Sequence, residues 1–222
     1  MHSSLLSAKE RLLLQLRNEG VTDQRVLDAL WRVPRERFVP RQLQHRAYEN
    51  IALPIGSDQT ISQPYVVARM AQALDLTEHD HVLEVGTGSG YGAAVLAQLA
   101  HDVVTVELRP ELAGTAESRL RDLGYSNIRC VVGDGSKGWP ALGPYDAIAL
   151  TAATPSISPR HWEQLRENGG RLVAPIGTLQ EQRLLLFRRS PGHLDCRSLG
   201  NVRFVPLLGV AGFNMLDPAR MN

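Results

Sequence analysis

The stretch that decides the fold is Val82-Leu83-Glu84-Val85-Gly86-Thr87-Gly88-Ser89-Gly90-Tyr91, an apolar run followed by three alternating glycines. The apolar run over 82–85 predicts a short buried strand, and the segment from Tyr91 to Leu99 predicts a helix. Glycines between a strand and a helix allow a tight turn and close approach of the backbone to a ligand. The stretch therefore predicts a ligand-binding loop at the end of a sheet strand.

The alternation of strand and helix continues after this loop. Further strands are predicted at Val103–Val106, Ile128–Val132, Ala147–Leu150, Arg171–Pro175, Leu184–Phe187 and Val202–Leu207, and helices at Glu111–Leu123 and Pro159–Glu167. Such a rhythm is typical of an α/β protein with a mostly parallel central sheet and helices on both faces, a Rossmann-like fold. Ligands of such sheets bind at the carboxyl ends of the strands.

The first 80 residues lack this rhythm and predict a helical extension. Helices are expected over 5–18, over 23–31 with Asp23 as N-cap, and over 64–74, while Val33–Pro40 is expected to be an irregular connector. We expect one domain of residues 1–222, in which this extension folds onto a core at 81–208. Residues 209–222 are expected to form a tail, which is frayed over 215–222.

Composition excludes several classes of protein. With 24 basic and 23 acidic residues the net charge is +1, which gives no electrostatic footprint for nucleic acid or a membrane surface. The charged N-terminus is no signal peptide, no stretch approaches the ~18 apolar residues of a membrane span, and two scattered cysteines predict no disulfide framework. We expect a cytoplasmic monomer. No metal cluster is predicted, and the pair His79/His81 is expected to face solvent in a turn.

The spacing of the glycines favours one class of cofactor. A dinucleotide fingerprint would place its third glycine at position 91, where this sequence has Tyr91. The form G-x-G-x-G, with Glu84 before it, is the pattern of S-adenosylmethionine methyltransferases. The predicted cofactor loop is thus Gly86, Thr87, Gly88, Ser89 and Gly90.

Two later segments complete the predicted cofactor site. Glu107 and Leu108 end the second strand, 21 and 22 residues after Gly86, where an acidic side chain can accept from two ribose hydroxyls; the alternative is a surface charge. Gly133-Asp134-Gly135 follows the third strand, and Asp134 either accepts from the adenine amine or makes the turn. Thr151, directly after the fourth strand, belongs to the same predicted edge.

The methyl acceptor is less directly encoded. Methyltransferases acting on base amines carry an Asn/Asp-Pro-Pro-aromatic run after the fourth strand, but this sequence has Thr151-Ala152-Ala153-Thr154-Pro155, which disfavours a nucleic-acid substrate. Residues 51–64 form a loop rich in hydroxyl and amide groups. This loop is either a binding surface or a self-capping lead into the helix at 64–74, with Ser62 or Gln63 as N-cap.

Several segments together resemble the protein-L-isoaspartate (D-aspartate) O-methyltransferases. The resemblance spans about residues 10–208 and is carried by Val33–Pro40, Leu53–Gly56, Gln59–Pro64, the glycine loop, Gly133–Gly135, Tyr145–Ile148, Gly169–Val173 and Val202–Leu207. It implies methyl transfer from S-adenosylmethionine, leaving S-adenosylhomocysteine, to the free α-carboxylate of isoaspartyl residues in damaged proteins and peptides, and possible action on D-aspartyl residues. The ester then collapses to a succinimide, whose hydrolysis restores some normal aspartate.

The resemblance also implies roles for the loop at 58–62. The active-site serine of the family corresponds to Ser62, expected to orient the acceptor as a hydrogen-bond donor, and Asp58, Gln59, Thr60 and Ile61 are expected to shape the acceptor site. An ionised carboxylate needs no general base, so alignment with the methyl group is the main requirement.

Two residues depart from the family pattern. Asp58 stands where bacterial relatives usually have glycine, and Gly92 stands where a glutamine is common. Because Asp58 adds a negative charge near a site meant for a carboxylate, two alternatives stay open. One is a related enzyme that methylates a carboxylate on a specialised peptide, and the other is an adaptor that binds damaged chains without turnover.

Overall fold

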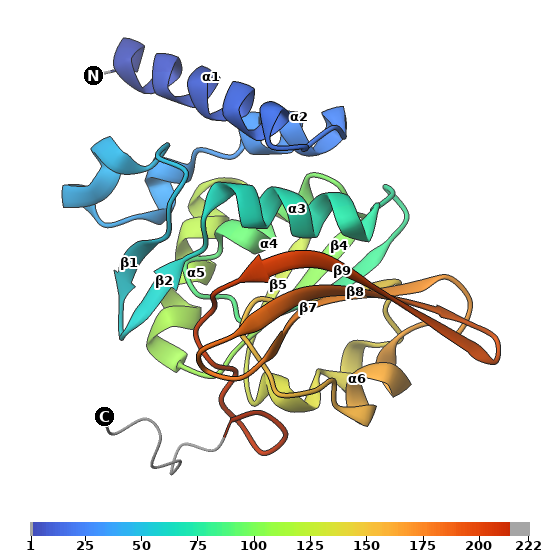
Figure 1. Cartoon of the computed structure of the whole chain (residues 1–222). Helices are drawn as coiled ribbons and strands as arrows, with labels where there is room; N and C mark the ends of the chain where they lie inside the picture. The colour runs from blue at the N-terminus through green and yellow to red at the C-terminus, as the bar shows by residue number, and fades with distance from the viewer. Residues whose placement is uncertain (1, 214–222) are drawn as a thin grey trace.

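The computed structural model describes residues 2–213, and its centre is a seven-stranded sheet of order β5-β4-β3-β6-β7-β8-β9 (Figure 1). The first five strands in that order are parallel and the last two pairings are antiparallel. The strands are β3 (His81–Val85), β4 (Asp102–Glu107), β5 (Ile128–Val132), β6 (Ala147–Leu150), β7 (Gly170–Gly177), β8 (Gln182–Ser190) and β9 (His193–Val202). This architecture confirms the predicted Rossmann-like fold.

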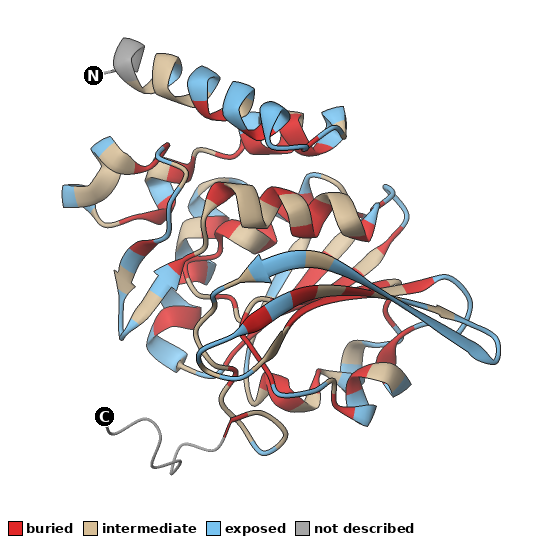
Figure 2. Cartoon of the chain, viewed as in Figure 1, coloured by how far each residue is buried: buried red, intermediate tan, exposed pale blue. Residues whose placement is uncertain are grey.

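Helices cover both faces of the sheet, as predicted. They are α1 (His2–Asn18), α2 (Gln24–Arg32), α3 (Pro64–Leu74), α4 (Tyr91–Ala97), α5 (Pro110–Asp122) and α6 (Pro159–Gln164), with short 3-10 turns η1 (Arg35–Phe38), η2 (Arg41–Arg46), η3 (Gly135–Lys137) and η4 (Pro140–Leu142). Side chains of α3, α4 and α5 share one buried cluster with Val82 and Val103, whereas Leu83 and Val104 point into a second cluster on the opposite face, beside α6. The buried residues therefore follow the strands through the centre of the molecule (Figure 2).

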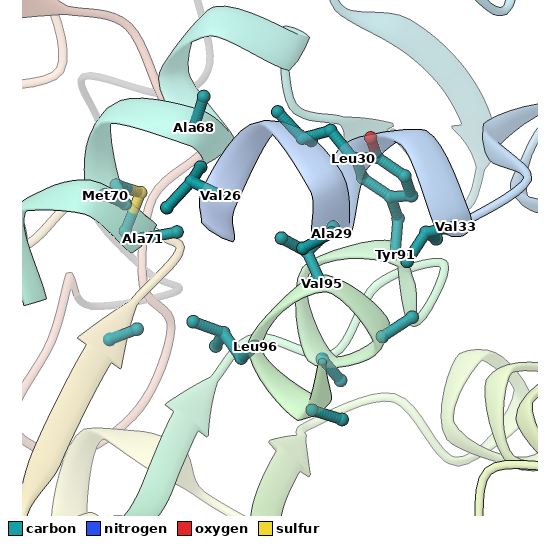
Figure 3. Packing of buried hydrophobic residues seen from close by; sticks show 14 of the residues in the cluster. Val26, Ala29, Leu30, Val33, Ala68, Met70, Ala71, Tyr91, Val95 and Leu96 are labelled. Carbon is teal, nitrogen blue, oxygen red and sulfur yellow. The ribbon is translucent and has the colours of Figure 1, made fainter. Parts of the chain in front are cut away.

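The N-terminal helices pack on the outside of the first cluster. Val26, Ala29 and Leu30 of α2 face Val95 of α4 and the apolar side of α3 (Figure 3). Asp23 caps α2 by accepting from the N–H of Arg25 at 2.9 Å, as predicted. The extension is thus joined to the core by continuous apolar packing.

The register of the sheet gathers the ends of three strands. Val85 of β3 lies opposite Val106 of β4 and Leu150 of β6. The next residue or two of each strand therefore emerge at one edge of the sheet. The glycine loop, Glu107 and Thr151 meet there, which positions the site.

Two predicted elements were wrong. Residues 51–64 are no featureless loop, because β1 (Leu53–Gly56) and β2 (Gln59–Ile61) form an antiparallel hairpin. The last strand runs over His193–Val202 instead of Val202–Leu207, since the polar residues of 193–198 pair with β8 at an exposed sheet edge, where apolar alternation is not required. The segment after it makes only an isolated bridge between Ala153 and Pro206.

Of the pair His79/His81, only His81, the first residue of β3, differs from expectation. His79 is exposed, but His81 is only partly exposed and its Nδ1 lies 2.8 Å from Asp102 Oδ2 while its Nε2 lies 2.7 Å from the carbonyl of Leu142. His81 therefore joins two strands and a turn at the end of the sheet remote from the glycine loop. Residues 215–222 of the predicted tail lie outside the described part. Within residues 2–213, no helix has the length and apolar character of a membrane span.

Candidate active site

The glycine loop is the turn between β3 and α4. Gly86, Gly88 and Gly90 have φ angles of +103°, +52° and +88°, which side chains rarely adopt. A Cβ on Gly86 would overlap the hydroxyl of Thr151. That hydroxyl donates in bifurcated fashion to the carbonyls of Val85 (2.9 Å) and Gly86 (2.7 Å). The loop conformation thus requires glycine and is braced by Thr151.

Glu107 lies beside this loop at the end of β4. Its side chain accepts hydrogen bonds from the N–H groups of Gly88 (2.9 Å) and Arg109 (3.0 Å). Glu107 is only 8% exposed, so the alternative that it is a surface charge is wrong. Each carboxylate oxygen has a second lone pair, which leaves Glu107 able to accept from the hydroxyls of a ligand.

Glu84 is the buried carboxyl beneath the loop. Its Oε2 accepts from the hydroxyl of Thr105 at 2.6 Å, and that hydroxyl lies 2.7 Å from the hydroxyl of Thr87. Burial, with a smaller contribution from the charge of Glu107, raises the pKa of Glu84 to about 8. Glu84 is therefore mostly protonated at neutral pH, and its carboxyl forms the floor of the site without adding a full negative charge.

The carboxylate of Asp134 is engaged by the chain itself. It accepts from the N–H (3.0 Å) and hydroxyl (2.6 Å) of Ser136 and from the N–H of Val210 (3.1 Å). Hydrogen bonding to these groups lowers the pKa of Asp134 despite its partial burial. Asp134 thus makes the turn after β5 and also holds residues 209–211 against it. A role toward the adenine amine stays a prediction.

The hairpin β1–β2 forms the other wall of the site. Its tip is Ser57-Asp58, two residues with φ of +50° and +55°, a turn that suits the twist of a hairpin. The side-chain amide of Gln59 donates to the carbonyl of Asp58 at 3.1 Å. Gln63 is the N-cap of α3 and makes no side-chain cap hydrogen bond, so no capping role occupies the hydroxyl of Ser62.

One cavity brings the two walls together. It is lined by residues of β2 and α3, the glycine loop and α4, the end of β4, the turn after β5, the end of β6, and the segment after β9. The predicted residues among them are Gln59, Thr60, Ile61, Ser62, Glu84, Gly86, Thr87, Gly88, Ser89, Glu107, Leu108, Gly135 and Thr151. Hydroxyl and carboxyl groups of the cofactor side therefore face the short polar side chains of the hairpin.

Four predicted residues lie outside this lining: Asp58, Gly90, Gly133 and Asp134. Asp58 is exposed at the hairpin tip, and Gly90 packs against α5, where a Cβ would lie 3.3 Å from Leu120. The lining also contains residues that sequence reasoning missed, among them Val67, Met70, Tyr91, Gly92, Arg109 and Val205–Leu208. The apolar side of the predicted helix at 64–74 was the available signal for Val67 and Met70.

Comparison with known proteins agrees with this geometry. A family model described as Protein-L-isoaspartate(D-aspartate) O-methyltransferase matches residues 7–212. The chain belongs to this family. A protein-L-isoaspartate O-methyltransferase from Herpetosiphon aurantiacus is 51% identical over 90% of this chain and 88% of that protein. Another, from Serratia proteamaculans, is 51% identical over 90% of this chain and 95% of that protein.

Solved structures support the same assignment. A structure named protein-L-isoaspartate O-methyltransferase is 31% identical and has a TM-score of 0.82, covering 96% of this chain and 69% of that chain. A Plasmodium falciparum structure in complex with S-adenosyl-L-homocysteine has a TM-score of 0.76 at 23% identity, covering 89% of this chain and 97% of that chain. The second likeness supports the fold.

The departure from the family pattern at Gly92 has a local explanation. A Cβ at this position would overlap Oε1 of Glu84. Gly92 therefore leaves room for the Glu84 side chain beneath α4. The departure at Asp58 stays at the exposed tip of the hairpin, where solvent screens its charge.

A second cavity adjoins the first. It is lined in part by Thr60, Ser62, Thr151 and Val205, which both cavities share, and it extends over Tyr65, Arg69, Asn201 and Arg203 toward the surface. Thr60 and Ser62 therefore lie where the cavity beside the glycine loop meets this second cavity, which forms a groove over Tyr65 and Arg69. No group of three or more metal-ligating side chains gathers anywhere in the part of the chain that the structure describes.

Proposed function

We propose that this protein methylates the free α-carboxylate of L-isoaspartyl residues in damaged proteins and peptides, using S-adenosylmethionine and leaving S-adenosylhomocysteine. The observation that carries the proposal is the shared lining: Thr60, Ser62 and Thr151 border both the cavity beside the glycine loop and the adjoining groove. Membership of the family supplies the substrate class. Action on D-aspartyl residues, a monomeric state, a cytoplasmic location and the absence of nucleic-acid or membrane partners belong to the same proposal.

The cofactor side fits the chemistry of S-adenosylmethionine. We assign Glu107 to the ribose hydroxyls, because its buried carboxylate has free lone pairs toward the cavity. The glycine loop and Thr87 would wrap the methionine portion, and Leu108, Gly135 and Leu207 would enclose the adenine. When bound, the cofactor supplies an electrophilic methyl group on a sulfonium, which passes to the acceptor oxygen while the bonding pair stays on sulfur.

The acceptor side has only to hold and aim a carboxylate. A carboxylate with an ordinary pKa near about 4 is ionised at neutral pH, so no residue needs to remove a proton. We assign Ser62 as the positioning donor to this carboxylate and Thr60 as its neighbour at the rim. Correct alignment of the reacting atoms can account for several kcal/mol of the barrier.

The groove next to Ser62 supports a protein or peptide as the substrate. An isoaspartyl residue within a chain carries a peptide segment on each side, so the acceptor pocket must open onto a surface channel. The groove over Tyr65, Arg69 and Asn201 leads away from Ser62. The methyl ester then leaves as methanol when the neighbouring backbone nitrogen attacks the ester carbonyl, and the resulting succinimide hydrolyses partly to normal aspartate.

The deciding experiment uses two peptides that differ only in one linkage. The protein is incubated with methyl-labelled S-adenosylmethionine and a peptide containing either L-isoaspartate or L-aspartate. We expect label in the isoaspartyl peptide alone, released as methanol on mild base treatment. Equal labelling of both peptides, or of neither, would falsify the proposal. Labelling of only a dedicated natural peptide would instead favour the specialised carboxylate methyltransferase.

A further inference from the structure

Arg35 is a fully buried cation in the segment Val33–Pro40, which was expected to be a mere connector. Its side chain is 0% exposed although η1, where it lies, runs near the surface. No carboxylate forms an ion pair with it within residues 5–213, and its neighbour Glu36 is hydrogen-bonded to Tyr48. Burying an unpaired guanidinium costs several kcal/mol unless its donors are satisfied. Such a residue needs an explanation beyond packing.

The donors of Arg35 reach both ends of the hairpin. Its Nε donates to the carbonyl of Ala47 at 2.9 Å, and its Nη2 donates to the carbonyl of Ser62 at 2.8 Å and, more weakly, of Ile51 at 3.4 Å. Ala47 and Ile51 precede β1, whereas Ser62 follows β2. One planar fork therefore ties together the two chains at the base of the hairpin, a geometry that the point charge of a lysine cannot reproduce.

The same guanidinium also contacts the cofactor side. Its Cζ lies 4.7 Å from the centre of the Tyr91 ring, within the range of a cation–π contact. Tyr91 is the first residue of α4, directly after the glycine loop, and it lines the cavity. Arg35 therefore contacts both the base of the acceptor hairpin and the first residue of the helix that follows the cofactor loop.

We propose that Arg35 is a positioning residue for methyl transfer, which fixes Ser62 at a set distance from the methyl donor and places a buried positive charge behind the acceptor site. The inference rests on the proposed function and deepens it. A misplacement of about 1 Å can lower the rate about 100-fold. A clamp that prevents such a misplacement at the base of the hairpin can therefore offset the free-energy cost of burying the Arg35 charge. Nη1 has no hydrogen-bond partner among the described residues, and the partners of Nε and Nη2 are neutral carbonyls. The guanidinium therefore keeps its positive charge, which can attract an anionic acceptor.

The test compares Arg35→Lys and Arg35→Met with matched changes at Arg37, an exposed residue of the same turn. We expect Arg35→Lys to lower kcat on the isoaspartyl peptide about 100-fold, with affinity for S-adenosylhomocysteine changed less than about threefold. Arg35→Met removes the charge as well and should also raise KM for the peptide. Arg37→Lys and Arg37→Met should resemble the wild type. The folded fraction of each variant is measured by thermal unfolding, and each rate is corrected for it. If Arg35→Met does not fold, the result for Arg35→Lys alone tests the proposal.

Two further readouts separate positioning from general stability. If Arg35 acts through Ser62, Arg35→Lys and Ser62→Ala combined should lower kcat by much less than the product of their single effects. The second readout is hydrogen exchange of the backbone amides, which needs no substrate. The amides of residues 57–63 should exchange faster in Arg35→Lys than in Arg37→Lys. The exchange rates of the glycine-loop amides should be the same in both variants. Three results would each overturn the proposal. They are a double variant whose loss of kcat equals the product of the two single losses, an unchanged hydrogen-exchange rate of residues 57–63 in Arg35→Lys, and a loss of cofactor affinity in Arg35→Lys as large as its loss of kcat. A wild type that forms no isoaspartyl ester would instead reject the proposed function, and hydrogen exchange would still test the clamp.

Discussion

The glycine loop stands at the ends of buried parallel strands, whereas the acceptor hairpin stands on a two-stranded sheet with an exposed tip. The loop is braced by the hydroxyl of Thr151 and by Glu107, which follow or end neighbouring strands of the same sheet. The hairpin is held at its base by Arg35, 27 residues away in sequence from Ser62. The cofactor wall, formed by the glycine loop, Glu107 and Thr151, is therefore held by the ends of neighbouring strands. The acceptor wall, formed by the hairpin, is held by a residue outside the sheet.

This difference between the two walls predicts which positions of the site accept substitutions without loss of activity. The cofactor wall tolerates no side chain at Gly86, because both its φ angle and its surroundings exclude one. The acceptor wall tolerates unusual residues at its tip, since Asp58 is exposed and lies outside the cavity lining. Substitutions should therefore act through the cofactor in the first wall and through turnover in the second.

The largest effect is expected from breaking the cofactor wall with Gly86→Ala. The added Cβ would force Thr151 away and strain a backbone with φ of +103°, which costs about 1–3 kcal/mol. We expect kcat/KM to fall about 1,000-fold, or about 4 kcal/mol, with most of the loss in cofactor affinity measured by calorimetry. Gly114→Ala is the control, because a Cβ there meets nothing within 4 Å. An unchanged affinity of Gly86→Ala for the cofactor would contradict the inference that Thr151 and the backbone conformation of Gly86 hold the glycine loop in its binding shape.

Ser62→Ala should break the acceptor wall alone. Removing one positioned donor lowers turnover about 100-fold, and we expect kcat on the isoaspartyl peptide to fall by that order. Affinity for S-adenosylhomocysteine should stay within about twofold, because the backbone contact from Arg35 to the Ser62 carbonyl is kept. Ser118→Ala on the exposed side of α5 serves as control. If Ser62→Ala lost affinity for S-adenosylhomocysteine by as large a factor as it lost kcat, Ser62 would instead be assigned to the binding of the cofactor.

A subtler difference between the walls is the buried acid on the cofactor side. Burial raises the pKa of Glu84 from an ordinary 4.5 to about 8, so the folded state holds a proton that the unfolded chain releases above pH 4.5. The stability gained from this proton is complete below pH 4.5 and is lost as pH rises through about 8. Glu84→Gln should therefore show a flatter decline in unfolding free energy between pH 5 and 8 than the wild type, by denaturant titration. Parallel profiles would show that Glu84 is ionised in the fold.

The smallest effect is expected from Asp58→Gly at the hairpin tip. Glycine relieves a φ of +55° but has more freedom in the unfolded chain, so the unfolding free energy should change by less than about 1 kcal/mol. The removed charge is exposed and screened, and KM for the isoaspartyl peptide should fall less than about threefold. A larger fall in KM would place Asp58 in contact with the acceptor and reopen the specialised-peptide alternative.

The same contrast explains why the cofactor wall could be predicted from the sequence and the acceptor hairpin could not. Strands β5 and β6 were predicted to the residue. The glycine loop, Glu107 and Thr151 were found because they stand at the carboxyl ends of β3, β4 and β6, which the apolar runs of the sequence indicate. The hairpin was missed because Pro54 and the polar tip hide its alternation. Burial of Arg35 has no local signal at all, since its partners are the carbonyls of 47, 51 and 62, and carbonyls leave no trace in a residue pattern.

The last described segment has a consequence for synthesis of the chain. Val205–Leu208 line the cavity, Leu207 pairs with Ala153 through its N–H at 2.7 Å, and the N–H of Ala211 donates to Ser136 at 3.0 Å. A ribosome delivers the N-terminus first, so the glycine loop and the hairpin emerge more than 100 residues before the segment that encloses them. The nascent chain thus carries every predicted site residue while its pocket is still open to water, and a cofactor gains its full set of contacts only after residues 205–208 have been made.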